Sequence, residues 1–360
     1  MTNPVKIHYD SYPYPHYPLF ASVRRCDTYA LNLETLWARF NHALPPAEAK
    51  KILISGCGAF APYPWAVANP DVPITALDLS ERSLRRARLH CLVHGRRNIA
   101  YRCGDLTDRN AIDGEFGLID SYGVLHHLED PLAGLRALER RLVPGGILRI
   151  MLYSRYARRE EESLRRAFKL LGVDSPAGAR RLLRKAAAGS RLANFMAASD
   201  EAATVSGLAD ALLHPRVRTY RIEELLELIA QTGLELLMFA HHGAFGDPMA
   251  EVDRLRTLER ERRSPGNFVL YLGKNTDKTG GGNSDGMIML NPCLVSTVSR
   301  FTIGSLRIPP RTGAENPVLS CRERSFLRRF ITPLRRSDLP DDAAERVAEY
   351  QRLLFLAEYK

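Results

Sequence analysis

Residues Lys51–Gly58 read KILISGCG, and this short stretch decides the fold. An apolar run ends at two glycines with one residue between them, which is typical of a buried strand that enters a tight turn. Glycines at such a turn let the backbone approach a ligand closely, and the start of a following helix offers free N–H groups. By itself the pattern also fits a dinucleotide site or an ordinary tight turn.

The rest of the chain around this turn alternates between short apolar runs and helical patterns. We expect strands at 51–55, 73–79, 99–103, 116–122, 147–153, 234–239 and 267–272. We expect helices from about residue 65, at 80–94, 131–142 and 222–232, and around 253–263. Strands that alternate with helices predict an α/β fold whose parallel sheet has right-handed crossovers.

Acidic residues follow two of the expected strands. Asp78 comes 20 residues after Gly58, at the end of the second strand, and Asp105 follows the third. A carboxylate at the first position can accept hydrogen bonds from both hydroxyls of a ribose. A carboxylate at the second can accept from the amine of adenine. Because open α/β sheets bind ligands at the carboxyl ends of their strands, these positions predict a nucleoside-containing ligand.

The segments that follow allow a family to be identified. Residues 120–131 read DSYGVLHHLEDP, and a helix then leads to LVPGGILRIMLYS at 142–154. Together with ILISGCG, ALDLS and GDL, these motifs resemble the class I S-adenosylmethionine-dependent methyltransferases over about residues 51–154. The YDSYPYPHYP of 9–18 and the YSRYARR of 153–159 resemble a bacterial subgroup of these enzymes, some of which carry tetratricopeptide repeats. This chain shows no such repeats.

The resemblance implies a Rossmann-like seven-stranded methyltransferase sheet and S-adenosylmethionine as the cofactor. Gly56 and Gly58 would pack against its methionine and ribose parts, Asp78 would bind the ribose, and Asp105 would hold the adenine amine. Ser121, Tyr122 and Gly123 would lie beside the sulfonium. The full set of expected cofactor-binding residues is Ser55, Gly56, Cys57, Gly58, Asp78, Leu79, Asp105, Leu106, Ser121 and Tyr122.

Two positions depart from the family pattern. Ile54 stands where the family usually has an acidic residue, and Phe60 stands where a further glycine is expected. These departures favour an alternative in which the chain is a degenerate methyltransferase that serves as a binding or scaffold protein. The retained Asp78 and Asp105 argue against that alternative.

Methyl transfer mainly requires alignment of the reactants and removal of a proton from the acceptor. A histidine is a suitable base near neutral pH, and His126 and His127 follow the fourth strand, where the active-site mouth is expected. Tyr153, after the fifth strand, is a further candidate catalytic residue. Structural roles in helix–sheet packing remain open for all three. We expect no metal site, because no histidine has a carboxylate or cysteine partner at ligand spacing.

The segments outside the sheet suggest the domain organisation. Residues 1–48 should form an extended arm, because its prolines oppose a long helix, followed by a helix at 31–44. The tyrosine-rich arm could cover the cofactor or pack on the outside of the sheet. The methyltransferase domain would span 49–275 with a helical, basic insertion at 155–215. A linker at 276–286 and a mostly helical extension at 287–360 would follow.

Composition limits the remaining possibilities. The chain has 51 Lys and Arg against 41 Asp and Glu, a net charge of +10, so an RNA-directed methyltransferase using the basic helices is kept as an alternative. The six cysteines form no C-x-x-C pair, and we expect no signal peptide, no membrane span and a cytoplasmic protein. We expect the methyl group to go to an O, N or C atom, and we favour a small molecule or a protein as the acceptor. The sequence specifies neither the acceptor nor the oligomeric state.

Overall fold

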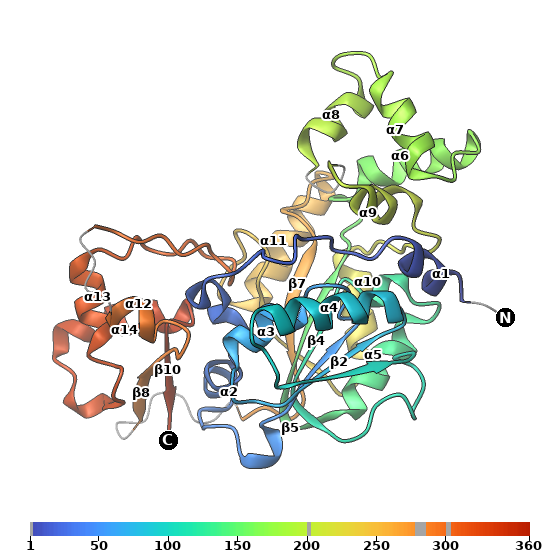
Figure 1. Ribbon diagram of the computed structural model, residues 1–360. Helices are drawn as coiled ribbons and strands as arrows, with labels where there is room; N and C mark the ends of the chain where they lie inside the picture. Colours follow the sequence, from blue (N-terminus) through green and yellow to red (C-terminus); the bar gives the residue numbers. More distant parts are fainter. Residues whose placement is uncertain (1–2, 200–202, 278–285, 300–303) are drawn as a thin grey trace.

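The computed structural model describes residues 3–199, 203–277, 286–299 and 304–360 (Figure 1). A seven-stranded sheet with the order β3-β2-β1-β4-β5-β7-β6 forms its centre. Its strands are β1 Ile52–Ser55, β2 Ile74–Asp78, β3 Ile99–Cys103, β4 Phe116–Tyr122, β5 Leu142–Leu152, β6 Glu235–Phe239 and β7 Phe268–Gly273. This arrangement confirms the expected Rossmann-like methyltransferase sheet.

One strand differs from the expected parallel arrangement. β7 lies between β5 and β6 and is antiparallel to both of them. The helix between β6 and β7 gave the sequence the appearance of another crossover unit. Apolar periodicity reports burial but not strand direction, so the sequence pattern could not distinguish this return connection from a parallel crossover.

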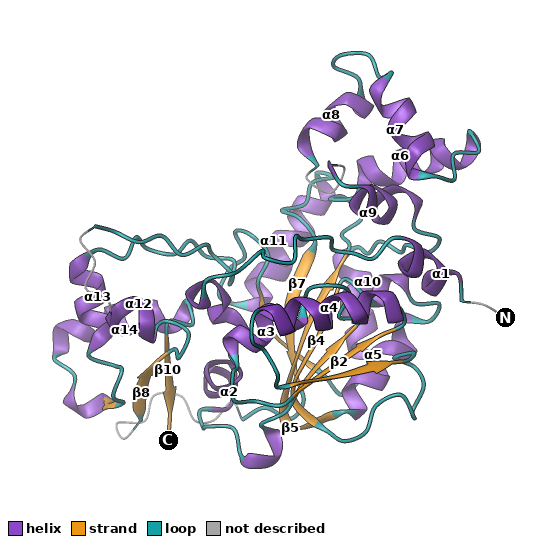
Figure 2. Ribbon diagram, in the orientation of Figure 1, coloured by secondary structure: helices purple, strands orange, loops and turns teal. Residues whose placement is uncertain are grey.

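Helices cover both faces of the sheet because the apolar side chains of each strand alternate between them. Ile52 and Ile54 of β1 face α2 Leu33–Asn41, α3 Pro62–Ala68 and α4 Glu81–Val93. Leu53 and the alternate residues of β4 and β5 face α5 Pro131–Arg140, α10 Ile222–Ala230 and α11 Pro248–Arg260. Figure 2 shows the strands between these two groups of helices. The resulting two-sided core fixes the strand ends at which the ligand-type residues lie.

The N-terminal arm is more helical than its prolines indicated. Helix α1, Pro4–Ser11, ends before the prolines at 13, 15 and 18. Pro4 occupies its first turn, where a proline is tolerated, and the side chain of Asn3 accepts a hydrogen bond from the Val5 N–H at 3.0 Å. The extended part of the arm begins only after Ser11, so the expectation of an extended chain from residue 8 was wrong there. A 3₁₀-helical stretch, Arg25–Leu31, leads to α2, and a 3₁₀ turn at Ala47–Ala49 precedes β1.

The insertion after β5 is helical, as expected. It consists of α6 Arg159–Leu170, α7 Pro176–Arg184, α8 Arg191–Ala198, α9 Val205–Leu208 and a π-helical turn, Ala209–Leu213. These elements share a small apolar cluster that includes Phe168, Leu183 and Leu208. Figure 1 shows these helices projecting from the main body, with α9 at the base.

The C-terminal segment contains a sheet that the sequence did not indicate. Its helices are α12 Val295–Ser299, α13 Cys321–Arg328 and α14 Ala344–Arg352, with 3₁₀ turns at Arg336–Asp338 and Asp341–Ala343. Antiparallel strands β8 Met287–Leu290, β9 Leu334–Arg335 and β10 Leu356–Tyr359 pair in the order β10-β8-β9. Of the expected linker, positions 278–285 lie outside the described residues. Within the described parts of the chain, no helix has the length and apolarity needed to cross a membrane.

Candidate active site

A cavity of about 1290 Å³ lies at the carboxyl ends of β1 to β5. Its volume exceeds the usual range for a single drug-sized ligand, which leaves room for two ligands side by side. The expected cofactor residues that line it are Gly56, Cys57, Gly58, Asp78, Leu79, Asp105, Leu106 and Tyr122. The strand ends therefore bring most of the predicted set to one place.

The turn after β1 requires both of its glycines. Gly56 and Gly58 have φ values of +65° and +55°, in the left-handed region that favours glycine. A Cβ on Gly56 would lie 2.4 Å from a methyl group of Val124, and one on Gly58 would lie 2.5 Å from the carbonyl oxygen of Tyr14. That carbonyl also accepts a hydrogen bond from Ala59 N at 3.0 Å. The glycine loop is thus shaped by the arm as well as by the cavity.

Asp78 is held by the backbone around it. One carboxylate oxygen accepts from Gly58 N at 2.7 Å and the other from Ser80 N at 2.8 Å. Burial raises the pKa of Asp78 to about 6, against the lowering effect of these two N–H groups. A carboxylate oxygen has two lone pairs, so each still has capacity to accept a ribose hydroxyl from the cavity. The group fits the role that the sequence assigned to it.

The residues expected at the adenine lie in the turn after β3. Asp105 Oδ1 accepts hydrogen bonds from the backbone N–H and hydroxyl of Thr107 at 2.8 and 2.7 Å, which fixes the carboxylate at the cavity wall. Leu106 is buried beside it and offers an apolar surface. A flat ring with an exocyclic amine fits this combination of an apolar surface and an acceptor.

Two expected residues, Ser55 and Ser121, are buried and are not among those that line the cavity. On β4 the reason is strand alternation: Asp120 and Tyr122 face the cavity, so Ser121 between them points to the opposite face. Asp120 was not singled out from the sequence, although its place two residues before Tyr122 on the same strand could have indicated it.

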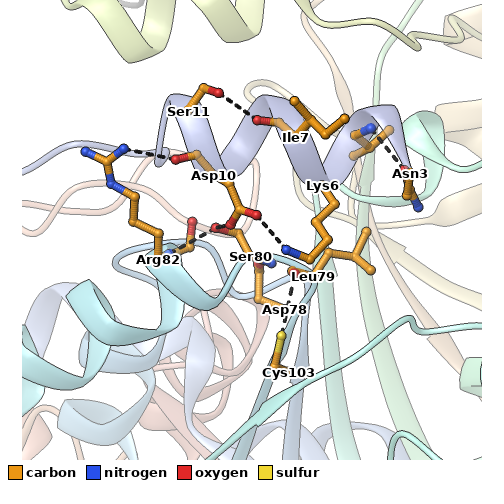
Figure 3. A network of polar contacts seen from close by, with 12 residues as sticks. Asn3, Lys6, Ile7, Asp10, Ser11, Asp78, Leu79, Ser80, Arg82 and Cys103 are labelled. Carbon is orange, nitrogen blue, oxygen red and sulfur yellow. Dashed lines mark hydrogen bonds and ion pairs between the residues drawn. The ribbon is translucent and has the colours of Figure 1, made fainter. Parts of the chain in front are cut away.

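The N-terminal helix is attached to the loop that carries Asp78 (Figure 3). The carboxylate of Asp10 accepts from Ser80 Oγ at 2.8 Å and from Lys6 Nζ at 2.6 Å. Its backbone carbonyl accepts from Arg82 Nη1 at 3.0 Å. Further along the arm, Tyr14 and Tyr17 line the cavity. The arm therefore lies along the cavity wall, which agrees with the hypothesis that it covers the cofactor.

The two histidines of the HHL motif occupy different surroundings. His126 is fully buried, stacks on Tyr153 with 3.8 Å between ring centres, and is not among the cavity-lining residues. His127 lines the cavity, and its Nδ1 lies 2.8 Å from the carbonyl oxygen of Arg216. Because a carbonyl only accepts, we assign the proton to Nδ1, which leaves the Nε2 lone pair available. Burial lowers the pKa of His127 to about 3, so the ring is neutral.

Other segments add polar groups around His127, and one of them, Asp210, was not singled out from the sequence. The ligand-type atoms of His127, Asp210 and His214 all lie within 4.8 Å of one another. Tyr9 of the arm donates to Asp210 Oδ1 at 2.9 Å, across 201 residues of sequence. Asp210 is the one acidic residue in the GLADALL of 207–213, which was the only sequence signal for it. Arm, HHL motif and insertion thus meet at one side of the cavity.

Comparison with known proteins identifies the family. The family model described as a methyltransferase domain matches residues 53–150. An uncharacterised protein of Synechococcus is 30% identical over 283 residues, 73% of this chain and 67% of that protein. The ubiquinone biosynthesis O-methyltransferase of Idiomarina loihiensis is 37% identical over 100 residues, 27% of this chain and 40% of that enzyme.

A solved structure shares the fold over most of the chain. PKMT2 from Rickettsia typhi, determined in complex with AdoHcy, aligns with a TM-score of 0.53 and 17% identity, over 77% of this chain and 59% of that one. The chain therefore spans less than two thirds of the length of this protein and of the ubiquinone enzyme.

The seven-stranded sheet and the glycine and carboxylate positions at its strand ends define a Rossmann-like methyltransferase. The chain belongs to the class I S-adenosylmethionine-dependent methyltransferases. It is an enzyme of that class, and S-adenosylmethionine is its cofactor.

Proposed function

We propose that the chain methylates an oxygen, nitrogen or carbon atom of a small molecule or protein segment, and that His127 takes the proton from the acceptor. The observation that carries this proposal is the hydrogen bond from His127 Nδ1 to the Arg216 carbonyl, which leaves Nε2 unprotonated at the cavity. When bound, S-adenosylmethionine supplies a methyl group on a positively charged sulfonium. As the acceptor atom bonds to the methyl carbon, its proton passes to Nε2 and S-adenosylhomocysteine is released.

Burial, together with the positive charges of Arg165 and Arg158, lowers the pKa of His127, so a proton on its ring needs a negative charge nearby. One ring nitrogen of His127 lies within 4.8 Å of a carboxylate oxygen of Asp210, and an opposite charge at that distance favours the charged imidazole. Tyr9 holds that carboxylate by a hydrogen bond. The arm that carries Tyr9 also lines the cavity and limits the access of water to the reacting atoms.

The same three side chains have a spacing that a metal ion could use, but their geometry supports proton transfer better. The rings of His127 and His214 stack with 3.7 Å between centres and 29° between planes, so their lone pairs run side by side instead of converging. His214 Nδ1 accepts from Arg216 N at 3.1 Å, and burial, with a smaller effect from the positive charge of Arg165, lowers the pKa of both histidines. We therefore assign the group to proton handling.

The basic insertion gives little support to an RNA acceptor. Arg155 forms an ion pair with Glu224 at 2.8 Å, and Arg165 donates to the carbonyl of His214 at 2.5 Å. Arginines that bind their own chain are less available to phosphates.

All six cysteines are free thiols, which supports our proposal that the enzyme is cytoplasmic.

The test uses methyl-labelled S-adenosylmethionine with a cell extract divided into small-molecule, protein and RNA fractions. We expect label in the small-molecule or protein fraction. His127→Asn keeps a donor for the Arg216 carbonyl but has no Nε2, so it should lower turnover by about 10²- to 10⁴-fold. Binding of S-adenosylhomocysteine, measured by calorimetry, should stay unchanged, and wild-type activity should survive dialysis against EDTA.

Three results would contradict parts of this proposal. Label found in RNA alone would refute the acceptor class, and full turnover by His127→Asn would refute the base. Loss of activity on EDTA treatment that zinc restores would assign His127, Asp210 and His214 to a metal.

A further inference from the structure

A row of four side chains crosses the sheet beside the glycine loop. In the strand pairing, Ile54 lies opposite Asp120, Asp120 opposite Arg149, and Arg149 opposite Tyr271. All four line the cavity. The row begins two residues before Gly56, so a carboxylate and a guanidinium stand directly next to the loop that receives the cofactor.

The Asp120–Arg149 pair is buried and incompletely satisfied. Asp120 Oδ2 accepts from Trp65 Nε1 at 3.0 Å, but Oδ1 accepts no hydrogen bond from any described residue. Arg149 Nη1 is 3.5 Å from Oδ1, beyond a good charge-assisted hydrogen bond. The guanidinium carbon lies 4.6 Å from the ring centre of Tyr122. A buried charge pair held this loosely costs stability, so a ligand that completes it would explain its presence.

The strand order indicates which part of the cofactor reaches this pair. Asp78 and Asp105, which take the adenosine, follow β2 and β3 on one side of β1, whereas β4 and β5 lie on its other side. A ligand with its adenosine over β2 and β3 and its centre at the glycine loop has its other end over β4 and β5. In S-adenosylmethionine that end is an amino acid, with one ammonium and one carboxylate.

We propose that Asp120 and Arg149 bind the amino-acid end of S-adenosylmethionine. Asp120 Oδ1 accepts from the α-ammonium, and the Arg149 guanidinium donates to the α-carboxylate. One acceptor and one donor of opposite charge match a zwitterion. The proposal also explains Ile54: the carboxylate that relatives usually carry at that position is supplied here by the residue opposite it on β4. It rests on the cofactor of the family and not on the role proposed for His127.

Two ligands that differ only at this end test the proposal by calorimetry. S-adenosylhomocysteine carries the amino-acid group, and 5′-methylthioadenosine has the same adenosine and thioether without it. Asp120→Asn keeps an oxygen for Trp65 but loses the charge, and Arg149→Gln removes the guanidinium. We expect each variant to bind S-adenosylhomocysteine about 10- to 100-fold more weakly, the effect of losing one charge-assisted hydrogen bond. Affinity for methylthioadenosine should change less than about 2-fold.

Controls separate the proposal from damage to the fold. The double variant Asp120→Asn/Arg149→Gln leaves no unpaired buried charge and should show the same selective loss. Asp253→Asn, which breaks the exposed pair with Arg256, should bind both ligands as wild type does. Equal weakening of both ligands, or unchanged affinity for S-adenosylhomocysteine, would overturn the proposal. Wild-type protein that binds neither ligand would overturn it together with the cofactor site, whereas inactive His127→Asn protein that binds both would leave it intact.

Discussion

Replacing Asp78 by asparagine tests how the ribose site is built. Burial raises the pKa of Asp78 from 3.8 to about 6, so the folded protein retains the proton more strongly than the unfolded chain. Stability from this group is therefore present at low pH and is lost as the pH rises through 6. The difference between the two pKa values corresponds to a cost of about 3 kcal/mol at pH 8 and about half of that at pH 5. The asparagine variant does not carry this cost.

Asparagine introduces a penalty of its own, which does not depend on pH. Its amide oxygen can accept from either Gly58 N or Ser80 N, but its NH₂ group then faces the other N–H. One buried donor left unsatisfied costs about 1–3 kcal/mol. The change in stability between two pH values isolates the charge, because the other titrating groups are the same in both proteins.

The measurement is urea unfolding of wild type and Asp78→Asn at pH 5 and pH 8. We expect the stability of the variant relative to wild type to increase by about 1.4 kcal/mol from the lower to the higher pH. At pH 8 the variant should also bind S-adenosylhomocysteine at least about tenfold more weakly, because it has lost the charged acceptor for the ribose. If the stability of the variant relative to wild type stays constant or falls with pH, Asp78 does not carry a destabilising buried charge.

Three further substitutions test neighbouring parts of the structure. Gly58→Ala would place a Cβ 2.5 Å from the Tyr14 carbonyl, so the arm should be displaced and cleaved faster in limited proteolysis; an unchanged cleavage rate would contradict that contact. Trp65→Phe removes the donor to Asp120 Oδ2 and should lower the free energy of unfolding by about 1–3 kcal/mol, which an unaltered urea midpoint would disprove. Glu251→Gln weakens a fully buried carboxylate network with His241 and Arg254, for which we expect a loss of about 3–5 kcal/mol at pH 7; a loss below about 1 kcal/mol would argue against it.

The sheet and the strand ends that line the cavity could be predicted because their signals are local. The strand Phe116–Tyr122 was predicted with the bounds that the structure has, since its apolar first half and the glycines on either side, at 114 and 123, leave little choice. The glycines after β1 and the carboxylates after β2 and β3 each follow a strand end directly. A position relative to a strand end is enough to place such residues at one edge of a parallel sheet.

Features that depend on side-chain direction or on distant contacts could not be predicted in this way. Whether Asp120 or Ser121 faces the cavity depends on the phase of β4, and a strand that is buried on both faces does not reveal that phase by alternation. The approach of Tyr9 to Asp210 joins two segments 201 residues apart, and neither segment has a motif that identifies the other. The small sheet of the C-terminal segment was also missed; its three strands pair across long stretches of chain, and β9 has only two residues.

The parts of the site that could be predicted lie in the family core, and the parts that could not be predicted lie in the arm and the insertion. The family match ends at residue 150, so it contains the cofactor loops and the HHL motif but neither Tyr9, Asp210 nor His214. Those three residues come from the arm and the insertion, which surround the side of the cavity where an acceptor would react. Relatives that share only the core can therefore share the cofactor while differing in acceptor. The identity of the acceptor should accordingly be sought by changing the arm and the insertion, because the core residues serve a ligand common to the family.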